Sequence, residues 1–265
     1  MELPVFDPVI FKIWGPIAIN WYGLMYLLGF VGAWYMGRSR CRQPGSAFTE
    51  EQMSDFLFYA FLGVVLGGRI GYVFFYQFDR FLAEPAYLIR IWEGGMSFHG
   101  GFLGVAASCW YYGRMTGKGF FTVADFFVPM VPIGLFTGRV GNFINGELWG
   151  RVTDLQSTPW AMIFPSDPLR ALRHPSMLYE AFFEGIVLFI MLYFFSKKPK
   201  PAMAVSALFL IGYGSFRFFI EYFREPDAHL KEMAEFLSMG QVLSLPMILV
   251  GIAMMVLAYR NDIKK

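Results

Sequence analysis

The sequence predicts an all-α integral membrane protein, and its low charge, its long apolar runs and the placement of its basic residues each support that prediction. Hydrophobic residues make up 56% of the 265 residues and charged residues only 16%, whereas a soluble domain carries about 25% charged residues. So few charges cannot cover a surface in water, which excludes a disordered chain, a disulfide-rich scaffold and a nucleic-acid-binding protein. The net charge of +2 indicates no acidic partner.

Seven apolar runs predict seven transmembrane helices, each of which needs roughly 20 residues. The runs lie at 17–36, 54–76, 98–113, 120–143, 176–195, 202–223 and 239–259. The residues at 144–175, rich in Pro, Ser and Asp, are expected to form a small external cap. No cleavable signal peptide is expected, because Glu2, Asp7 and Lys12 interrupt the N-terminus. The whole chain, 1–265, is therefore expected to be a single polytopic membrane domain.

The basic residues predict how the chain is oriented in the membrane. Four short loops are basic and nearly free of acids, with Arg38, Arg40 and Arg42, then Arg114 and Lys118, then Lys197, Lys198 and Lys200, then Arg260, Lys264 and Lys265. Loops rich in Lys and Arg stay in the cytoplasm. The N-terminus is therefore expected outside and the C-terminus in the cytoplasm.

Three arginines, Arg69, Arg139 and Arg217, fall inside the predicted spans. Each would cost roughly 3 kcal/mol at the bilayer centre on insertion scales. With the expected orientation, all three lie toward the outer leaflet, as do His99 and Tyr22. Arginines that snorkel at helix ends are the alternative explanation. The whole set is better explained by a polar, water-accessible cavity that opens outward, with Arg69 among the residues that bind substrate there.

Glycines repeat every four residues in three of the predicted spans. Gly63, Gly67 and Gly71 form one such row, Gly100 and Gly104 form a second, and Gly134 and Gly138 form a third. Rows of small residues allow membrane helices to approach closely. We therefore expect most of these glycines to lie at helix–helix contacts.

The stretch GRVGNFINGELWG at 138–150 places four polar residues at the end of an apolar helix. Arg139 and Asn142 are three residues apart and so share a helix face. An arginine offers a planar fork of donors that suits phosphate. Glu147 could orient Arg139 or accept a proton. The stretch therefore predicts a binding site for a phosphate group.

The sixth span repeats this pattern. Tyr213, Arg217, Glu221 and Arg224 follow one another at spacings of four, four and three, and so line one helix face. Arg217 and Glu221 can pair, which lowers the cost of burying both. A purely structural ion pair is the alternative.

His99, in FHGG at 98–101, is the candidate for proton transfer, because a histidine can act as a base at neutral pH. Three scattered histidines and two distant cysteines make no metal set, and no Gly-rich phosphate loop occurs. Neither a metal nor a cofactor is therefore expected. From the residues alone, the chain is an enzyme or a carrier that acts on an anionic phospholipid.

The stretch at 138–150 resembles the signature G-R-x-G-N-F-x-N-x-E-x-x-G of the bacterial phosphatidylglycerol–prolipoprotein diacylglyceryl transferases. The similarity covers nearly the whole chain and includes WYGLMY at 21–26, LGGRIGYVFFY at 66–76, WEGGMSFHGG at 92–101, RHPSMLYE at 173–180 and the segment 212–227. The resemblance implies importance for the matched positions, which are Tyr22, His99, Arg139, Asn142, Glu147, Gly150, Tyr213, Arg217, Glu221 and Arg224. Catalytic roles are expected for Tyr22, His99, Arg139 and Arg217, and substrate binding for the others and for Arg139.

The resemblance also implies a reaction, the first step of lipoprotein maturation. The diacylglyceryl group of phosphatidylglycerol passes to the thiol of the lipobox cysteine in a prolipoprotein signal peptide, a thioether forms and glycerol phosphate leaves. The substrate supplies the nucleophile, so the protein needs none. The enzyme is expected to cross the bacterial inner membrane several times, with its active site on the periplasmic side.

Two alternatives stay open at this point. A carrier or flippase for an anionic lipid would use the same arginines without chemistry, but carriers usually have pseudo-symmetric halves, and the chain has only a short GRxG repeat at 68–71 and 138–141.

The route of the thiol proton also stays open. The proton either goes to His99 or needs no strong base, because the arginines could lower the thiol pKa from about 8.5.

Overall fold

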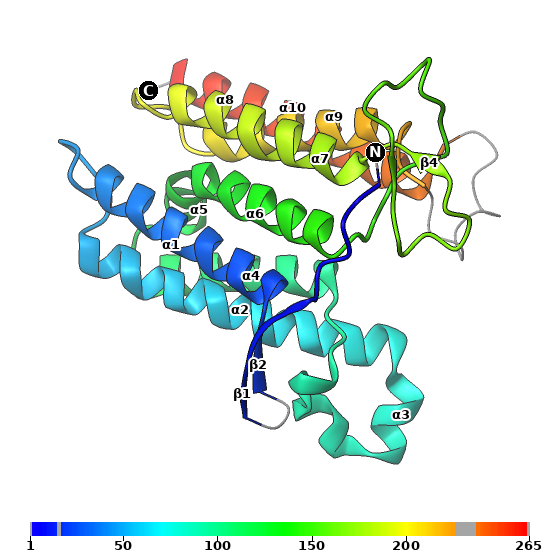
Figure 1. Cartoon of the computed structure of the whole chain (residues 1–265). Coiled ribbons are helices and arrows are strands. Elements are labelled where there is room, and N and C mark those ends of the chain that lie inside the picture. Colours follow the sequence, from blue (N-terminus) through cyan, green and yellow to red (C-terminus); the bar gives the residue numbers. More distant parts are fainter. Residues whose placement is uncertain (1, 15–16, 226–236, 264–265) are drawn as a thin grey trace. The chain divides into compact units, whose positions relative to one another are not determined.

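The computed structural model describes residues 2–14, 17–225 and 237–263, and these are mostly helical (Figure 1). The main helices are α1 (Trp21–Cys41), α2 (Glu50–Tyr76), α4 (Phe98–Met115), α5 (Phe120–Phe127), α6 (Val131–Ile144), α7 (Ser176–Glu180), α8 (Leu188–Phe195), α9 (Ala204–Ile220) and α10 (Met239–Ile263). Short helical segments join some of them: α3 (Phe78–Ala83), η1 (Pro85–Ile89), η2 (Ile91–Glu93), η3 (Val128–Met130) and η4 (Ala181–Val187). The prediction of a mostly helical membrane protein is confirmed.

Four described helices are long and apolar enough to cross a membrane. They are Glu50–Tyr76, Phe120–Ile144, Ser176–Phe195 and Met239–Ile263, and Ala204–Ile220 is a shorter apolar helix. Seven spans and the placement of the two termini stay predictions, and Lys264 and Lys265, used for that orientation, lie outside the described residues.

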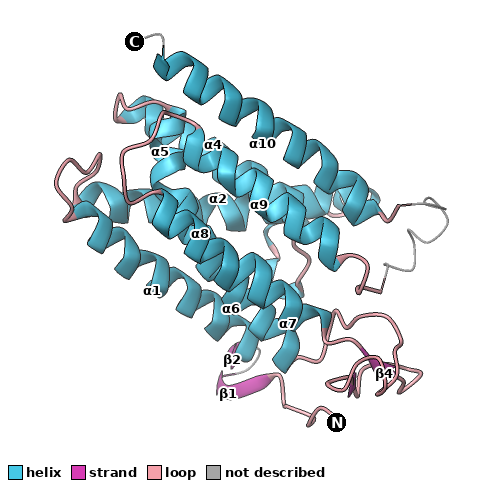
Figure 2. Cartoon of the chain, turned by 90° about the horizontal axis from the view of Figure 1, so that it is seen from above, coloured by secondary structure: helices cyan, strands magenta, loops and turns pink. Residues whose placement is uncertain are grey.

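The start of the first predicted span is wrong. Residues Ile17–Asn20 form strand β2, which pairs antiparallel with β1 (Val9–Trp14), and helix α1 begins only at Trp21. Isoleucine and valine are frequent in both strands, and β-branched residues favour extended backbone. The apolar residues 17–20 therefore belong to a strand and not to the first membrane helix (Figure 2).

The chain divides into two compact units, residues 34–126 and residues 1–33 with 127–265. The single membrane domain expected from the sequence stays a prediction. In the unit 34–126, α2 and α4 pack along each other. Helix α2 begins with a capping box, in which Thr49 accepts from the Gln52 backbone N–H at 3.2 Å and the Gln52 side chain accepts from that of Thr49.

The first two glycine rows predicted from the sequence form the contact between α2 and α4, whereas in the third row, on α6, a Cβ added to Gly138 would meet nothing within 4 Å. A Cβ added to Gly104 would lie 1.9 Å from the carbonyl oxygen of Gly63, and one added to Gly100 would lie 2.2 Å from that of Gly67. No side chain fits at such distances, so the two backbones touch directly. Ser108 donates to the carbonyl oxygen of Tyr59 at 2.9 Å and adds a polar contact between the same helices.

The other unit is built around α6, with α7, η4 and α9 nearby. Gly185 of η4 lies against Phe136 of α6, because a Cβ there would be 2.7 Å from the Phe136 Cβ. The segment η4 is a π-helix, a wider turn that often occurs at functional sites. Helices α9 and α10 pack side by side (Figure 2), and Gly214 and Gly251 lie at that contact.

The segment between α6 and α7, which we call the cap, contains a small sheet of β3 (Met162–Ile163) and β4 (Leu172–Arg173), so the fold is not purely helical. Its expected external location stays a prediction. Asp167 and Arg173 form a buried two-pronged ion pair, with Nε–Oδ2 at 2.6 Å and Nη2–Oδ1 at 3.0 Å. The hydrogen bond from Arg173 lowers the pKa of Asp167. Arg173 also lies over the Trp149 ring. This pair gives the cap an ordered core.

The glycine contact generates a stability prediction. Gly104→Ala should lower the free energy of unfolding by about 1–3 kcal/mol, because the added methyl group must push two backbones apart. Gly101→Ala, on the same helix, is the matched control, since its Cβ would have only an ordinary contact 3.6 Å from the Val64 carbonyl oxygen. Thermal unfolding of the purified protein measures both. Equal midpoints for the two variants would contradict the close contact.

Candidate active site

A single carboxylate, that of Glu180, gathers three arginines from different parts of the chain. Its Oε1 accepts from Arg217 Nη1 at 2.6 Å and from Arg224 Nη1 at 3.0 Å, and its Oε2 lies 2.7 Å from Arg139 Nε. The Glu180 side chain is 1% exposed, whereas those of the arginines are 12–19% exposed. The carboxylate is therefore buried, whereas each arginine side chain keeps a small part of its surface exposed. We call these four residues the arginine cluster.

Two further carboxylates border the arginine cluster. Glu221 Oε2 lies 2.8 Å from Arg217 Nη2, so the pair expected from their spacing is present. Glu184 Oε2 lies 3.8 Å from Arg139 Nη2, and among the described residues neither Glu184 oxygen has a hydrogen-bond partner. With Glu180, these carboxylates balance the buried positive charge, because an unpaired ion in such a place is very costly.

The arginine cluster depends on where four segments end. Arg139 lies on α6, Glu180 is the last residue of α7, Arg217 is in the last turn of α9, and Arg224 follows that helix. Gly150 N–H donates to the His174 carbonyl just before α7 at 2.8 Å, and Arg151 N–H donates to the Phe223 carbonyl just after α9 at 2.9 Å. The cap thus fixes the start of α7 relative to the end of α9.

Gly150 has a packing reason to be glycine. A Cβ there would lie 2.3 Å from the Phe223 carbonyl oxygen and 2.8 Å from the His174 Cβ. Gly150 also forms an antiparallel bridge with Arg224, and Arg173 Nη1 donates to the Gly150 carbonyl at 3.2 Å. These contacts join the cap to Arg224, one of the three arginines of the cluster. The part expected for Gly150 in substrate binding stays a prediction.

The signature segment adds a second group of polar contacts. Asn142 Nδ2 donates to Glu147 Oε1 at 2.8 Å, and Arg139 Nη1 donates to Asn142 Oδ1 at 3.4 Å. The link from Glu147 to Arg139 therefore passes through Asn142. Glu147 is exposed, whereas Asn142 is buried. This arrangement leaves a carboxylate at the surface beside Arg139.

Two tyrosines lie beside the helices that carry these arginines. Tyr22, on α1, packs against Gly141 of α6, where a Cβ would lie 3.0 Å from Tyr22 Cδ2. Tyr213 lies one turn before Arg217 and stacks on Phe209, with ring centroids 5.7 Å apart. Tyr213 thus lies one turn from Arg217, and Tyr22 contacts α6 two residues after Arg139.

Arg69 and His99 belong to the other compact unit, so their place beside the arginine cluster stays a prediction. Arg69 is buried and donates to the carbonyl oxygens of Tyr87, Leu88, Gly94 and Gly95. Its guanidinium also lies over the Tyr87 ring. These contacts hold the loop between α3 and α4. His99 is exposed in the first turn of α4.

The sequence analysis did not select Glu180 or Glu184 as site residues. Both are fully buried in the structure. Two acidic residues four apart inside an apolar span could have indicated their role, because buried carboxylates need cations. Within the described ranges, no three His, Cys, Asp or Glu side chains are placed to hold a metal ion.

Comparison with known proteins identifies close relatives. Residues 8–257 match the family described as prolipoprotein diacylglyceryl transferase. Three similar proteins carry the name phosphatidylglycerol–prolipoprotein diacylglyceryl transferase. The one from Vibrio campbellii is 58% identical, covering 99% of this chain and 94% of its own. Those from Photobacterium profundum and Pseudoalteromonas translucida are 58% and 56% identical, each covering 100% of this chain and 97% of its own.

The contact between Arg217 and Glu221 generates a prediction about coupling. Arg217→Ala should reduce kcat/KM for transfer more than Glu221→Gln, because Glu221 acts only through the direction of the arginine. The double variant should lose less than the sum of the single losses, with a coupling of about 0.5–3 kcal/mol.

The exposed ion pair of Arg38 with Glu50, at 2.7 Å in the other unit, is the control. The variants Arg38→Ala and Glu50→Gln should leave transfer unchanged. Strictly additive losses for Arg217 and Glu221 would mean that the two side chains act independently.

Proposed function

Because the chain belongs to the prolipoprotein diacylglyceryl transferase family, we propose that it uses the arginine cluster to move the diacylglyceryl group of phosphatidylglycerol onto the lipobox cysteine of a prolipoprotein. The chain is a membrane transferase, and this reaction is the first step of lipoprotein maturation. The substrate peptide supplies the nucleophile, a thiol. An anionic lipid carrier, the alternative left open by the sequence, is disfavoured by the identity of the relatives.

The arginine cluster is the observation that carries the proposal. A phosphodiester is a singly charged anion with two free oxygens, and arginine is the side chain best suited to bind such a group through paired N–H donors. A guanidinium has five N–H donors, and Arg217 directs only two of its nitrogens toward Glu180 and Glu221. Donors therefore remain for a ligand that reaches the exposed side of the arginines.

The reaction balances without a cofactor. The thiol sulfur attacks the glyceryl carbon that carries the phosphate, the C–S bond forms and the C–O bond to phosphate breaks. The electron pair of that bond leaves with glycerol phosphate, whose added negative charge Arg139 and Arg217 stabilise. Donors already held in place need no reorganisation as this charge develops, which lowers the barrier.

The thiol proton has two possible routes. His99 can take it as a general base near neutral pH. Alternatively, the arginines lower the thiol pKa enough for the thiolate to form without a strong base. Either way, the proton can finally pass to the released phosphate monoester, whose second pKa is about 6.

The remaining residues are proposed to position the lipid and the arginines. Asn142 and Glu147 steady Arg139 through the hydrogen bonds described above. Tyr22 and Tyr213 border the lipid head group, and Gly150 keeps the cap close to Arg224. Arg69 acts indirectly, because its donors bind carbonyl oxygens of the loop between α3 and α4.

The proposed location is the bacterial inner membrane, with the site facing the periplasm. The four basic loops support this orientation, because Lys and Arg mark the cytoplasmic side. A periplasmic site also suits the substrate, since a prolipoprotein would be modified after its export.

The direct test uses purified protein in phosphatidylglycerol vesicles with a peptide that carries a lipobox cysteine. The proposal expects a thioether-linked diacylglyceryl peptide and released glycerol phosphate, both detectable by mass spectrometry. Movement of lipid between leaflets without any thioether product would instead identify a carrier.

Arg139 generates a prediction about phosphate recognition. Arg139→Ala should reduce the transfer rate by roughly a hundredfold to a thousandfold, the loss typical for one donor that stabilises developing negative charge. Arg139→Lys should recover little, because a point charge cannot reproduce the planar fork. Arg114→Lys, in the last turn of α4 at the end expected to face the cytoplasm, is the matched control and should keep full activity. Near-normal turnover of Arg139→Lys would contradict binding through the fork.

A further inference from the structure

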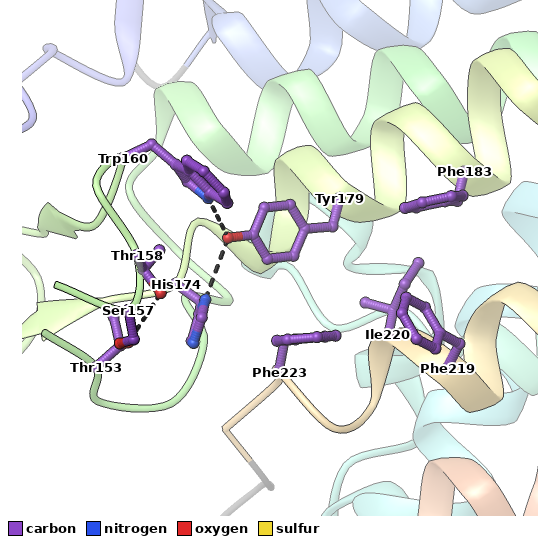
Figure 3. A pocket seen from close by; sticks show the side chains of 10 residues that line it. All are labelled: Thr153, Ser157, Thr158, Trp160, His174, Tyr179, Phe183, Phe219, Ile220 and Phe223. Carbon is purple, nitrogen blue, oxygen red and sulfur yellow. Dashed lines mark hydrogen bonds between the residues drawn. The ribbon is translucent and has the colours of Figure 1, made fainter. Parts of the chain in front are cut away.

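A second feature near the arginine cluster is a cavity of about 430 Å³ between the cap and the ends of α7 and α9 (Figure 3). The residues that line it are Thr153, Ser157, Thr158, Trp160, His174, Tyr179, Phe183, Phe219, Ile220 and Phe223. None of these was selected as a site residue from the sequence. Its volume is within the range of roughly 300–1,000 Å³ that holds a small organic ligand, so a few residues of a peptide would fit.

The cavity has two chemically different ends. Thr153, Ser157 and Thr158 of the cap form a wall of hydroxyl groups, linked by contacts of 3.2 and 3.0 Å from Thr153 Oγ1. At the other end lie Phe183 of η4 and Phe219 of α9, both on apolar membrane-type helices (Figure 3). An occupant must therefore have an apolar part toward the membrane and polar groups toward the cap.

Tyr179 joins the two ends. Its hydroxyl accepts from Trp160 Nε1 at 2.6 Å and lies 3.1 Å from His174 Nδ1 (Figure 3). Its ring packs edge-on against Phe223. These contacts fix the aromatic walls, so the cavity is formed before any ligand binds.

The cavity carries no charge. Its lining includes no Lys, Arg, Asp or Glu, and burial lowers the pKa of His174, which favours the neutral ring. An uncharged cavity has no means to hold a phosphate, in contrast to the arginine cluster. Its occupant is therefore a neutral part of a substrate.

The cavity and the arginine cluster share their framework. Tyr179 precedes Glu180, Ile220 precedes Glu221, and Phe223 precedes Arg224. Three lining residues are thus sequence neighbours of Glu180 and Arg224 of the arginine cluster and of Glu221 beside it. They lie on two segments, α7 and the end of α9. Whatever lies in the cavity is held close to a phosphate bound at the arginines.

Resting on the proposed function, we infer that this cavity binds the short uncharged peptide segment that adjoins the reactive cysteine of the prolipoprotein. Small apolar side chains would face Phe183 and Phe219, and peptide N–H and C=O groups would bond with the cap hydroxyls. An acyl chain matches only the phenylalanines, and the glycerol head group matches only the hydroxyls. A peptide matches both ends.

The test separates the two substrates by their Michaelis constants. Phe219→Ala removes one apolar wall, and at 50% exposure it should not disturb folding. We expect the KM for a synthetic signal peptide with small apolar residues before its cysteine to rise about tenfold, the effect of a lost apolar contact of about 1.4 kcal/mol. The KM for phosphatidylglycerol should stay within twofold of that of the unmodified protein.

Phe182→Ala is the matched control, because Phe182 is also 50% exposed and adjoins Phe183 but does not line the cavity. It should leave both constants unchanged. A rise in the KM for the lipid alone would assign the cavity to the lipid, and no change in either constant would show that it binds neither substrate. Both results would overturn the inference.

A binding experiment keeps this inference separate from the reaction itself. The same peptide with a photoreactive side chain before its cysteine is irradiated with the inactive Arg139→Ala variant in phosphatidylglycerol vesicles. We expect crosslinks to residues 153–160 and 219–223, lost when unlabelled peptide competes. Crosslinks elsewhere, while the unmodified protein still makes the thioether, would refute the cavity but not the proposed function. Absence of thioether from the unmodified protein would refute the proposed function.

Discussion

The site depends on one buried carboxylate that lies among three arginines. An arginine inside a membrane is costly, roughly 3 kcal/mol near the bilayer centre, and three without partners would rival the net stability of a whole domain. Glu180 contacts all three at 2.6–3.0 Å, and Glu221 and Glu184 lie beside them. The carboxylates stabilise the arginines in the folded chain and also orient them, so stability and the proposed phosphate binding rest on the same contacts.

This arrangement explains why two positions near the site are glycine. Gly150 lets the cap meet the end of α9, and Gly185 lets η4 approach α6, in both cases where a Cβ would lie less than 3 Å from another atom. The elements that carry Glu180, Arg139 and Arg224 could not converge with bulkier residues at these positions. The glycines therefore contribute to the site through the positions of other residues, whether or not they touch a substrate.

Much of the fold could be predicted from the sequence, because apolar length and the spacing of polar residues are local signals. The helices lie close to the predicted spans, and Arg217 pairs with Glu221 as a spacing of four requires. Other features depend on tertiary contacts. The strand at Ile17–Asn20 forms by pairing with β1. Glu180 contacts Arg217 and Arg224, which follow it in the sequence by 37 and 44 residues.

The central role of this carboxylate is tested most directly by the Glu180→Gln variant. The quantity to measure is its rate of thioether formation, divided by the amount of folded protein. Glutamine keeps the size of the side chain but removes the charge that holds three guanidinium groups. Because a misplacement of about 1 Å can cost a hundredfold in rate, the account predicts at least roughly a hundredfold loss, with partial recovery in Glu180→Asp. A Glu180→Gln variant that turns over within threefold of the unmodified protein would contradict it.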